Sequence, residues 1–425
     1  MTDDRPLETV DPELAGLIRR DLARQNSSIH LIASENFVSR AVLSATGSVF
    51  TNKYAEGFPG RRYYEGCAVV DEMEELAKAR CLALFGGAHA NVQPHSGAQA
   101  NMAVYFSLLE PGDTVLGMAL DQGGHLTHGS PVNFSGRLYD FVSYGIDPET
   151  ERIDMDEVRR LAVEHRPKIV LAGYSAYPRH LDYEAFRSIA DEVGAVFMVD
   201  AAHFIGLVAG RAMPSPVEHA DVVSFTTHKA LRASRGGAIV TNDEELGRRI
   251  EKGLFPNVQG GSLYNQIAGK AAGFHEAAQP AFRDYAARIV ANAAAMAERF
   301  TEEGVRLVTG GTDNHLMLLD LRSVDAELTG REAAKRLDRI GITLNFNSIP
   351  NDPRPPFRTS GLRVGTPAST TQGLGATEHA EVASLIAAVL RAGDDDGALA
   401  PLEARVREIA TAHPPYPEDF PGYVG

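Results

Sequence analysis

The feature that most constrains the fold is a series of short apolar segments separated by helix-like stretches. Residues 169–172 (Ile-Val-Leu-Ala) and 195–199 (Ala-Val-Phe-Met-Val) contain no polar side chain, and a helical pattern occupies residues 183–193 between them. Strands without polar alternation are typically buried on both faces, as in a parallel sheet covered by helices. We therefore predict an α/β fold whose large domain, residues 29–280, contains a mostly parallel sheet.

The C-terminal part of the chain has a different order of elements. After a helical stretch at 281–303, we expect strands at 305–308, 316–321, 342–346 and 362–364, and helices at 331–340 and 377–391. Because strands and helices do not alternate strictly, this pattern predicts a smaller α+β domain over residues 281–425. Residues 1–28 are expected to form an N-terminal arm, and the Pro-rich residues 414–421 a trailing tail.

Charge and composition exclude several classes of protein. The 41 Lys and Arg residues stand against 56 Asp and Glu, a net charge of −15, without a basic segment that would favour nucleic acid. No segment approaches the run of about 18 apolar residues that marks a membrane span. Cys67 and Cys81 are too few for a disulfide framework or a Cys-based zinc cluster, which fits a reducing compartment. We expect a cytoplasmic protein without a metal site.

An acidic residue and a lysine follow two of the apolar segments. Asp200 ends the segment 195–199, and Lys229 comes just past the apolar pair Val222-Val223. Ligands of open α/β folds bind at the carboxyl ends of the strands. Such a pair suits a pyridoxal phosphate enzyme, in which the lysine forms a Schiff base and the carboxylate keeps the pyridinium nitrogen protonated. Taken singly, Asp200 could cap a helix and Lys229 could be a solvated surface charge.

Residues 96–101 (Ser-Gly-Ala-Gln-Ala-Asn) predict an anion site, because they follow a short expected strand and open a helix. The free N–H groups and the dipole at a helix N-terminus favour a phosphate, although a serine there could also be an ordinary N-cap. The chain has neither a Walker A pattern nor a GxGxxG motif, which disfavours a nucleoside triphosphate or a dinucleotide.

Two further residues could contact a cofactor or a substrate. Arg363, on the expected strand 362–364, could clamp a carboxylate through two parallel hydrogen bonds, or it could be a surface arginine. The imidazole of His125, within residues 123–129 (Gly-Gly-His-Leu-Thr-His-Gly), could stack on a flat cofactor or simply pack within its loop.

The chain resembles the serine hydroxymethyltransferase family of pyridoxal phosphate enzymes, which have the aspartate-aminotransferase fold (fold type I). The resemblance extends from residues 31–36 (Leu-Ile-Ala-Ser-Glu-Asn) to 363–368 (Arg-Val-Gly-Thr-Pro-Ala). Its other motifs are residues 51–57, 62–64, 123–129, 199–203, 227–229, 259–261 and 347–353. It implies a hydroxymethyltransferase that converts serine or α-methylserine to glycine or alanine and transfers the one-carbon unit to the co-substrate tetrahydrofolate.

The resemblance also implies roles for individual residues. The catalytic residues would be Lys229, Asp200, His228, Glu56 and Tyr64, with Glu56 as the acid/base group. The other cofactor contacts would come from Ser96, Gly97, His125, Ser175 and His203, and from Tyr54 and Gly261 of the neighbouring subunit. Substrate would contact Ser34, Tyr54, Glu56, Tyr64, His203 and Arg363. Folate would contact Glu56, Tyr63, Leu120, Gly124, Leu126 and Asn347. Sites shared between subunits imply a homodimer, alone or within a tetramer.

Several residues depart from the family pattern near the expected site. Ala230 and Ser234 replace the usual threonine and proline after the lysine, and Phe225 replaces a usual threonine. Glu65 stands in place of glycine, where its carboxylate could repel anionic folate, and residues 262–265 (Ser-Leu-Tyr-Asn) replace the common Pro-Leu-Met-His. These departures leave open a folate-independent aldolase for β-hydroxy amino acids, an L-threonine transaldolase, and a non-catalytic descendant that binds an amino acid.

Overall fold

The structure is a computed structural model that describes residues 5–417 and 419–423. Its centre is a seven-stranded sheet in the order β4-β10-β9-β8-β7-β5-β6. The strands are β4 (His89–Asn91), β5 (Thr114–Met118), β6 (Asp140–Tyr144), β7 (Ile169–Gly173), β8 (Val196–Asp200), β9 (Val222–Thr226) and β10 (Gly237–Thr241). Strands β5 to β9 pair in parallel, and β10 is antiparallel to both of its neighbours. The predicted α/β class with a mostly parallel sheet is confirmed.

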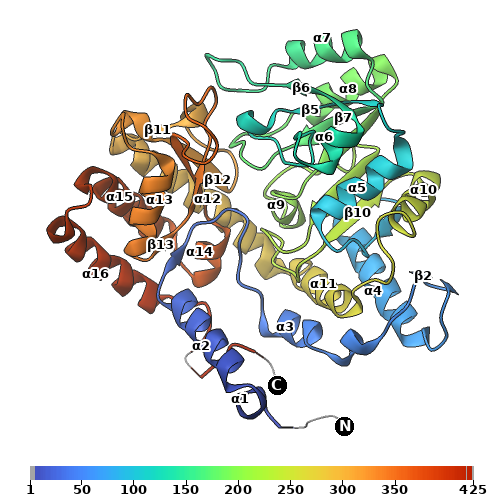
Figure 1. The fold of residues 1–425 in the computed structure, drawn as a ribbon, viewed down its shortest axis with the longest axis horizontal. Helices are drawn as coiled ribbons and strands as arrows, with labels where there is room; N and C mark the ends of the chain where they lie inside the picture. The colour runs from blue at the N-terminus through green and yellow to red at the C-terminus, as the bar shows by residue number, and fades with distance from the viewer. Residues whose placement is uncertain (1–4, 418, 424–425) are drawn as a thin grey trace.

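Helices cover both faces of this sheet (Figure 1). They are α4 (Ala68–Phe85), α5 (Gly97–Leu108), α6 (Phe134–Leu138), α7 (Met155–His165), α8 (Tyr183–Val193), α9 (Ile205–Ala209), α10 (Glu244–Leu254) and α11 (Tyr264–Ala277). Within β7, Ile169 and Leu171 join the hydrophobic cluster of α5 and α10, whereas Val170 and Ala172 join that of α4, α8 and α11. Successive strand residues point to opposite faces, so a strand covered on both sides needs an unbroken apolar sequence.

The C-terminal part forms a second lobe, drawn in orange and red in Figure 1. Its four-stranded antiparallel sheet has the order β11 (Arg306–Leu307), β12 (Leu316–Asp320), β15 (Gly361–Gly365) and β14 (Asn345–Asn347). Its helices are α13 (Gly330–Arg339), α14 (Pro367–Gln372), α15 (Ala376–Ala392) and α16 (Asp396–Ala412). Helix α12 (Pro280–Glu302) joins the lobes, because Phe282 belongs to the hydrophobic cluster of the first lobe and Phe300 to that of the second.

The single strand expected at 342–346 is wrong, because this segment contributes to two sheets. Strand β13 (Ile342–Thr343) pairs in parallel with β1 (Ile29–His30), whereas β14 joins the four-stranded sheet. Ile29 therefore packs in the hydrophobic cluster of the C-terminal lobe. The apolar pattern indicates that residues 342–346 are extended but does not specify their partners. The division into domains at residues 29 and 281 stays a prediction.

Both ends of the chain are more ordered than the sequence indicates. Helices α1 (Leu7–Val10) and α2 (Pro12–Asn26) form the N-terminal arm. The expected tail packs back onto the molecule, where the Tyr416 hydroxyl donates a hydrogen bond to the Val38 carbonyl at 3.0 Å and its ring meets Phe37 edge to face. Helix α16 was not expected, since Pro401 lies inside it. Within the described residues, no helix combines the length and the apolar character needed to span a bilayer.

Candidate active site

Predicted site residues lie at one edge of the seven-stranded sheet. His125 follows β5, Ser175 follows β7, Asp200 ends β8, and Lys229 follows β9. Because these strands are parallel neighbours in the sheet, their carboxyl ends meet at the same edge. The topology thus brings together residues that lie more than 100 positions apart in the chain.

Asp200 is a buried and ionised carboxylate. Its Oδ2 accepts hydrogen bonds from Asn101 Nδ2 at 2.8 Å and from His128 Nε2 at 3.2 Å, and its Oδ1 accepts one from the Ala202 N–H at 3.0 Å. Burial alone would raise the pKa of Asp200, but the hydrogen bonds and the neighbouring imidazoles outweigh burial and hold that pKa well below its usual range. The carboxylate can therefore hold a positive charge placed against it.

Asn101 and His128 extend this arrangement toward the predicted stacking residue. Asn101 Nδ2 also donates to Thr127 Oγ1 at 2.8 Å, and that hydroxyl lies 2.8 Å from Nδ1 of His125. Burial lowers the pKa of His125 to about 4, so its ring is neutral near pH 7. Asn101 and His128 were not assigned from the sequence, although both belong to motifs quoted above.

Two buried lysines differ in whether their amino groups are available. Burial lowers the pKa of Lys229 to about 8, against the opposing charge of Asp200, and its Nζ makes no hydrogen bond or ion pair with any described residue. Burial also lowers the pKa of Lys270 to about 7. Its Nζ, however, donates to the carbonyl oxygens of Val92, Pro94 and Gly237 at 2.7, 3.0 and 2.9 Å. Only Lys229 can offer a free amine to a ligand.

The predicted anion cradle lies at the start of α5. Ser96 is the N-cap residue, and its Oγ accepts a hydrogen bond from the Gln99 N–H at 3.2 Å. A Cβ at Gly97 would lie 2.6 Å from Cγ2 of Thr226, so only glycine permits this approach of the helix to the end of β9. The first N–H groups of a helix have no partner within it and favour an anion.

His228 lies beside this cradle and has an unused nitrogen. Its Nε2 is 3.2 Å from Nη1 of Arg235, and its buried Nδ1 has no hydrogen-bond partner. Burial, with a smaller contribution from Arg235, lowers the pKa of His228 to about 3, so the ring is neutral. An unpaired imidazole nitrogen next to a helix N-terminus fits a phosphate group that accepts hydrogen bonds from both.

His203 forms a stacked pair with a histidine that the sequence analysis missed. Nδ1 of His203 lies 3.4 Å from Nε2 of His315, and the ring centroids are 5.6 Å apart. Both rings are buried, and burial lowers the pKa of His315 to about 3 and that of His203 well below its usual value. The pair is therefore uncharged. His315 lies just before β12, a position that gave no local signal in the sequence.

Arg363, on β15, reaches across from the C-terminal lobe. Its Nη1 donates to the carbonyl oxygen of Ser175 at 2.7 Å, and its Nε donates to Oδ1 of Asn345 at 3.1 Å. Burial lowers the pKa of Arg363 to about 10, which leaves the guanidinium charged at neutral pH. Ser34 lines a cavity of about 250 Å³ together with His228 and Arg235.

A second cavity of about 450 Å³ opens beside His125 and Ser175. Its wall contains four of the six residues predicted to contact folate, which are Leu120, Gly124, Leu126 and Asn347. The other two, Glu56 and Tyr63, do not line it. The cavity adjoins the strand-end cluster, because His125 and Ser175 belong to both.

Tyr54, Glu56, Tyr64 and Gly261 form a separate group. The Tyr54 hydroxyl donates to Oε1 of Glu56 at 2.9 Å, and the Tyr54 ring meets that of Tyr64 edge to face at 5.3 Å. A Cβ at Gly261 would lie 2.9 Å from the Tyr54 ring. Among the described residues, no hydrogen bond or ion pair links this group to Lys229 or Asp200 of the same chain.

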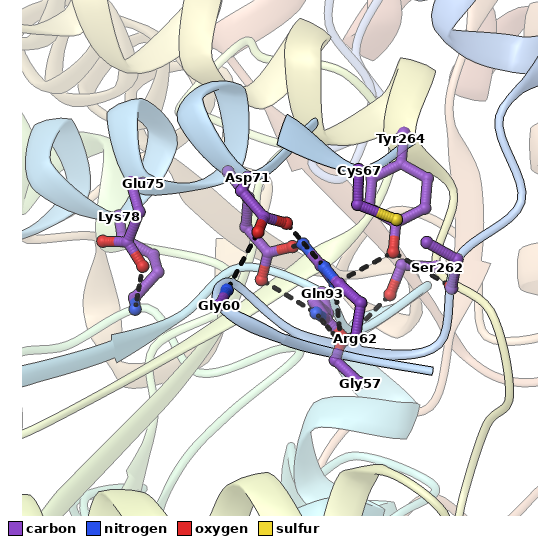
Figure 2. Close-up of polar contacts among 12 residues, drawn as sticks. Gly57, Gly60, Arg62, Cys67, Asp71, Glu75, Lys78, Gln93, Ser262 and Tyr264 are labelled. Carbon is purple, nitrogen blue, oxygen red and sulfur yellow. Dashed lines mark hydrogen bonds and ion pairs between the residues drawn. The ribbon is translucent and has the colours of Figure 1, made fainter. Parts of the chain in front are cut away.

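The segment that carries Tyr54 and Glu56 continues into a hairpin that contributes to a buried ionic network (Figure 2). The hairpin of β2 (Gly57–Phe58) and β3 (Arg61–Arg62) carries Arg62 into the interior, where its side chain is 3% exposed. Arg62 donates to Asp71 Oδ1 and to Glu74 Oε2, each at 2.7 Å. These partners compensate the cost of burying the guanidinium. We call Arg62, Asp71, Glu74, Gln93, Ser262 and Tyr264 the Arg62 network.

The residues that depart from the family pattern have different surroundings. Phe225 packs in the hydrophobic cluster that includes α4 and α11, with its ring centroid 5.0 Å from that of Phe85, so this departure belongs to the core and not to the site. The Ser234 hydroxyl donates to the Gln266 carbonyl at 2.7 Å and thereby anchors the loop that lacks the usual proline. Glu65 is exposed, and its carbonyl oxygen accepts a hydrogen bond from Lys53 at 2.8 Å.

Comparisons with known proteins agree with these observations. The family model described as serine hydroxymethyltransferase matches residues 7–386, which include every site residue discussed above. A serine hydroxymethyltransferase of Synechococcus sp. (strain JA-3-3Ab) is 56% identical over 421 residues, 97% of each chain. One of Nostoc punctiforme (strain ATCC 29133 / PCC 73102) is 53% identical over 411 residues, 97% of this chain and 96% of its own. The chain therefore belongs to the serine hydroxymethyltransferase family, and the predicted resemblance is confirmed.

Proposed function

We propose that this chain is a pyridoxal phosphate enzyme that interconverts serine and glycine, with tetrahydrofolate as the carrier of the one-carbon unit. The observation that carries the proposal is the free, buried amine of Lys229 at the same sheet edge as the ionised carboxylate of Asp200. The two relatives reported above are both named serine hydroxymethyltransferase, which favours serine over α-methylserine or threonine as substrate. The sheet order and the C-terminal lobe are consistent with fold type I.

The residues at the sheet edge fit the parts of this cofactor. The start of α5, with Ser96 and Gly97, and the unpaired Nδ1 of His228 would hold the phosphate. Asp200 would hold the protonated ring nitrogen, and the neutral ring of His125 would stack on the cofactor. When bound, pyridoxal phosphate draws electrons away from the substrate Cα, which makes a bond to that carbon easier to break.

The substrate would be oriented by Arg363 and Ser34. Arg363 is held by Ser175 and Asn345, so its remaining N–H groups have a fixed direction in which to clamp a carboxylate. The neutral imidazole of His203 would contact the cofactor side of the substrate without adding a charge. These contacts would fix the orientation of the bound amino acid. That orientation determines which bond to its Cα is cleaved.

The apolar cavity supports folate as the one-carbon acceptor. Leu120 and Leu126 are each 47% exposed, and an exposed leucine pair in a concave wall favours a flat ring system. Because His125 and Ser175 line both this cavity and the cofactor site, a ring bound there would lie next to the reacting carbon.

We infer that Tyr54, Glu56, Tyr64 and Gly261 complete the site of a second copy of the chain. Among the described residues they make no hydrogen bond with Lys229, and large apolar side chains near them in the sequence are exposed, including Val49 at 79% and Tyr63 at 76%. An exposed apolar patch next to a functional group is typical of an interface. Glu56 would then act as the acid/base group in the partner's site.

A mixing experiment tests the shared site. Lys229→Ala should be inactive alone and Glu56→Gln should keep only a small residual activity, because each removes one component of every site. Mixed dimers contain one intact site, so re-equilibrated equal mixtures should regain about a quarter of wild-type activity. Inactive mixtures in which mixed dimers are demonstrably present would contradict the shared site.

The assay for the function compares amino acids with and without tetrahydrofolate. Purified chain supplied with pyridoxal phosphate should form glycine from serine at a rate that depends on tetrahydrofolate. Release of acetaldehyde from threonine at an equal or higher rate without folate would favour the aldolase. Faster reaction of α-methylserine than of serine would favour an α-methylserine hydroxymethyltransferase, and the absence of any reaction would favour the non-catalytic descendant.

A further inference from the structure

We infer that Tyr264 is a positioning residue for Glu56, because its hydroxyl fixes the backbone segment that carries the Tyr54–Glu56 pair. The inference rests on the proposed acid/base role of Glu56. It concerns one of the residues at which this chain departs from the family pattern, where methionine is common.

Tyr264 connects the Arg62 network to the segment that carries Glu56, and Figure 2 shows its hydroxyl directed toward Arg62. The side chain is 1% exposed, and its hydroxyl donates to the Ala55 carbonyl oxygen at 3.0 Å. The Tyr264 hydroxyl oxygen in turn accepts a hydrogen bond from Nη1 of Arg62, also at 3.0 Å, and the guanidinium lies 5.4 Å from the centre of the tyrosine ring. Burial raises the pKa of Tyr264 well above its ordinary value, so the hydroxyl keeps the proton that it donates to Ala55.

Each carbonyl from Ala55 to Gly57 is held by a different group. The Ala55 carbonyl is held by Tyr264, and the Glu56 carbonyl accepts the Tyr63 N–H at 3.1 Å. The Gly57 carbonyl accepts Nη1 of Arg62 at 2.6 Å and Nε2 of Gln93 at 3.0 Å. Gly57 itself has φ of 89°, and a Cβ there would lie 2.4 Å from the Arg61 carbonyl oxygen. The backbone on both sides of Glu56 is therefore fixed, and its side chain is left to meet Tyr54.

The other residues of the network bond to one another and do not take over the hydrogen bond that Tyr264 makes with Ala55. Gln93 donates to Glu74 Oε1 at 2.8 Å and accepts the Ser262 hydroxyl at 2.8 Å. Ser262 is a second departure from the family pattern, in place of proline, and it anchors the turn that leads into Tyr264. None of these residues contacts the Ala55 carbonyl. Removal of the Tyr264 hydroxyl thus frees that carbonyl and leaves an Arg62 N–H without its acceptor.

The test is a double-mutant cycle with Tyr264→Phe and Glu56→Gln in the folate-dependent serine reaction. Misplacement of a reacting group by about 1 Å can cost up to a hundredfold in rate, so we expect Tyr264→Phe to lower kcat about tenfold or more. The KM for serine should change less, because Arg363 is untouched. The visible absorbance of bound cofactor should be unchanged. If Tyr264 acts through Glu56, the double variant is no slower than Glu56→Gln alone.

Tyr144→Phe is the matched control. Tyr144 is fully buried and its hydroxyl donates to a single carbonyl, that of Leu171, at 3.1 Å, far from the Arg62 network in the sheet. Its loss should lower the Tm without changing kcat. A Tyr264→Phe variant that behaves in the same way, or whose loss of kcat multiplies that of Glu56→Gln, overturns the inference.

Two further results separate this inference from the function on which it rests. If Glu56→Gln alone leaves kcat unchanged, the acid/base role of Glu56 is wrong and the role of Tyr264 is wrong with it. If Glu56→Gln is inactive and Tyr264→Phe is fully active, only the positioning role is wrong. Should Tyr264→Phe not fold, Tyr264→Met, which carries the common family residue, takes its place in the same cycle with the same expected results.

Discussion

Nη1 of Arg363 lies 2.7 Å from the carbonyl oxygen of Ser175, and this hydrogen bond joins β15 of the C-terminal lobe to the end of β7 in the large sheet. The guanidinium is buried, and Asn345 holds its Nε. The arginine that we propose to bind the substrate is therefore oriented by contacts with both lobes.

Replacement of Arg363 should weaken substrate binding more than chemistry. A hydrogen bond to a charged group contributes about 1.5–3 kcal/mol, so Arg363→Ala should raise the KM for serine by about ten- to a hundredfold. Arg363→Lys should recover only part of this, because a lysine cannot form the two-point contact. Steady-state kinetics with varied serine measure the effect, and Arg331→Ala, at an exposed position of α13, is the control. An unchanged KM in Arg363→Ala would contradict the assignment.

Asp200→Asn should retain the fold and lose the reaction. The amide can still bond to Asn101 and His128 but cannot neutralise a cationic ring nitrogen. The loss of one aimed electrostatic group typically costs about a hundred- to a thousandfold in kcat, and we expect a loss on this scale. Asp140→Asn, on the exposed edge of β6, should leave kcat unchanged. Equal rates for Asp200→Asn and the wild type would show that Asp200 does not act on the cofactor.

A carboxylate introduced into the apolar cavity should weaken the binding of folate without affecting the binding of serine. Leu126→Asp should raise the KM for tetrahydrofolate at least about tenfold, since it replaces apolar contact with a charge that repels the folate carboxylates. The KM for serine should change little. Val163→Asp introduces the same charge at an exposed position of α7 and should have no effect. Equal effects of the two substitutions would place folate elsewhere.

Cofactor uptake should depend on pH through Lys229. Burial lowers its pKa to about 8, and only the neutral amine can attack an aldehyde. Below pH 8 the ammonium predominates, so the rate of uptake by the cofactor-free chain should rise with pH and level off above about 9, whereas an exposed lysine of pKa about 10.4 would continue to gain. Because the charge of Asp200 raises the pKa of Lys229, Asp200→Asn should shift this profile to lower pH. Stopped-flow absorbance measures both, and a profile that still rises at about pH 11 would contradict the burial of Lys229.

The order of apolar segments predicts the sheet edge and the residues at its strand ends. Asp200 and Lys229 lie at the same sheet edge for the reason given by the sequence, because Asp200 ends β8 and Lys229 closely follows β9, its parallel neighbour. The anion cradle at Ser96 likewise follows from a short strand that leads into a helix. Each of these patterns is local in the sequence. The parallel pairing of the strands places the residues that they predict at one edge of the sheet.

Residues whose roles depend on distant partners could not be predicted. The sequence around Asn101 is that of an ordinary helix and does not indicate its hydrogen bond to Asp200. The sequence around His315 likewise does not indicate that its ring stacks on that of His203. Lys270 belongs to a helix of small residues, and nothing in that sequence indicates that three carbonyls surround its amine. The same reason accounts for the split of residues 342–346 between two sheets.

The most direct test of the account is the identity of the lysine that holds the cofactor. Reduction of the cofactor-loaded chain with borohydride, followed by mass spectrometry of its peptides, locates the attachment. We predict a single label on Lys229 and none on Lys270, whose buried amine is already bonded to three carbonyls. A label on Lys270, or a chain that takes up no pyridoxal phosphate, would contradict the central claim.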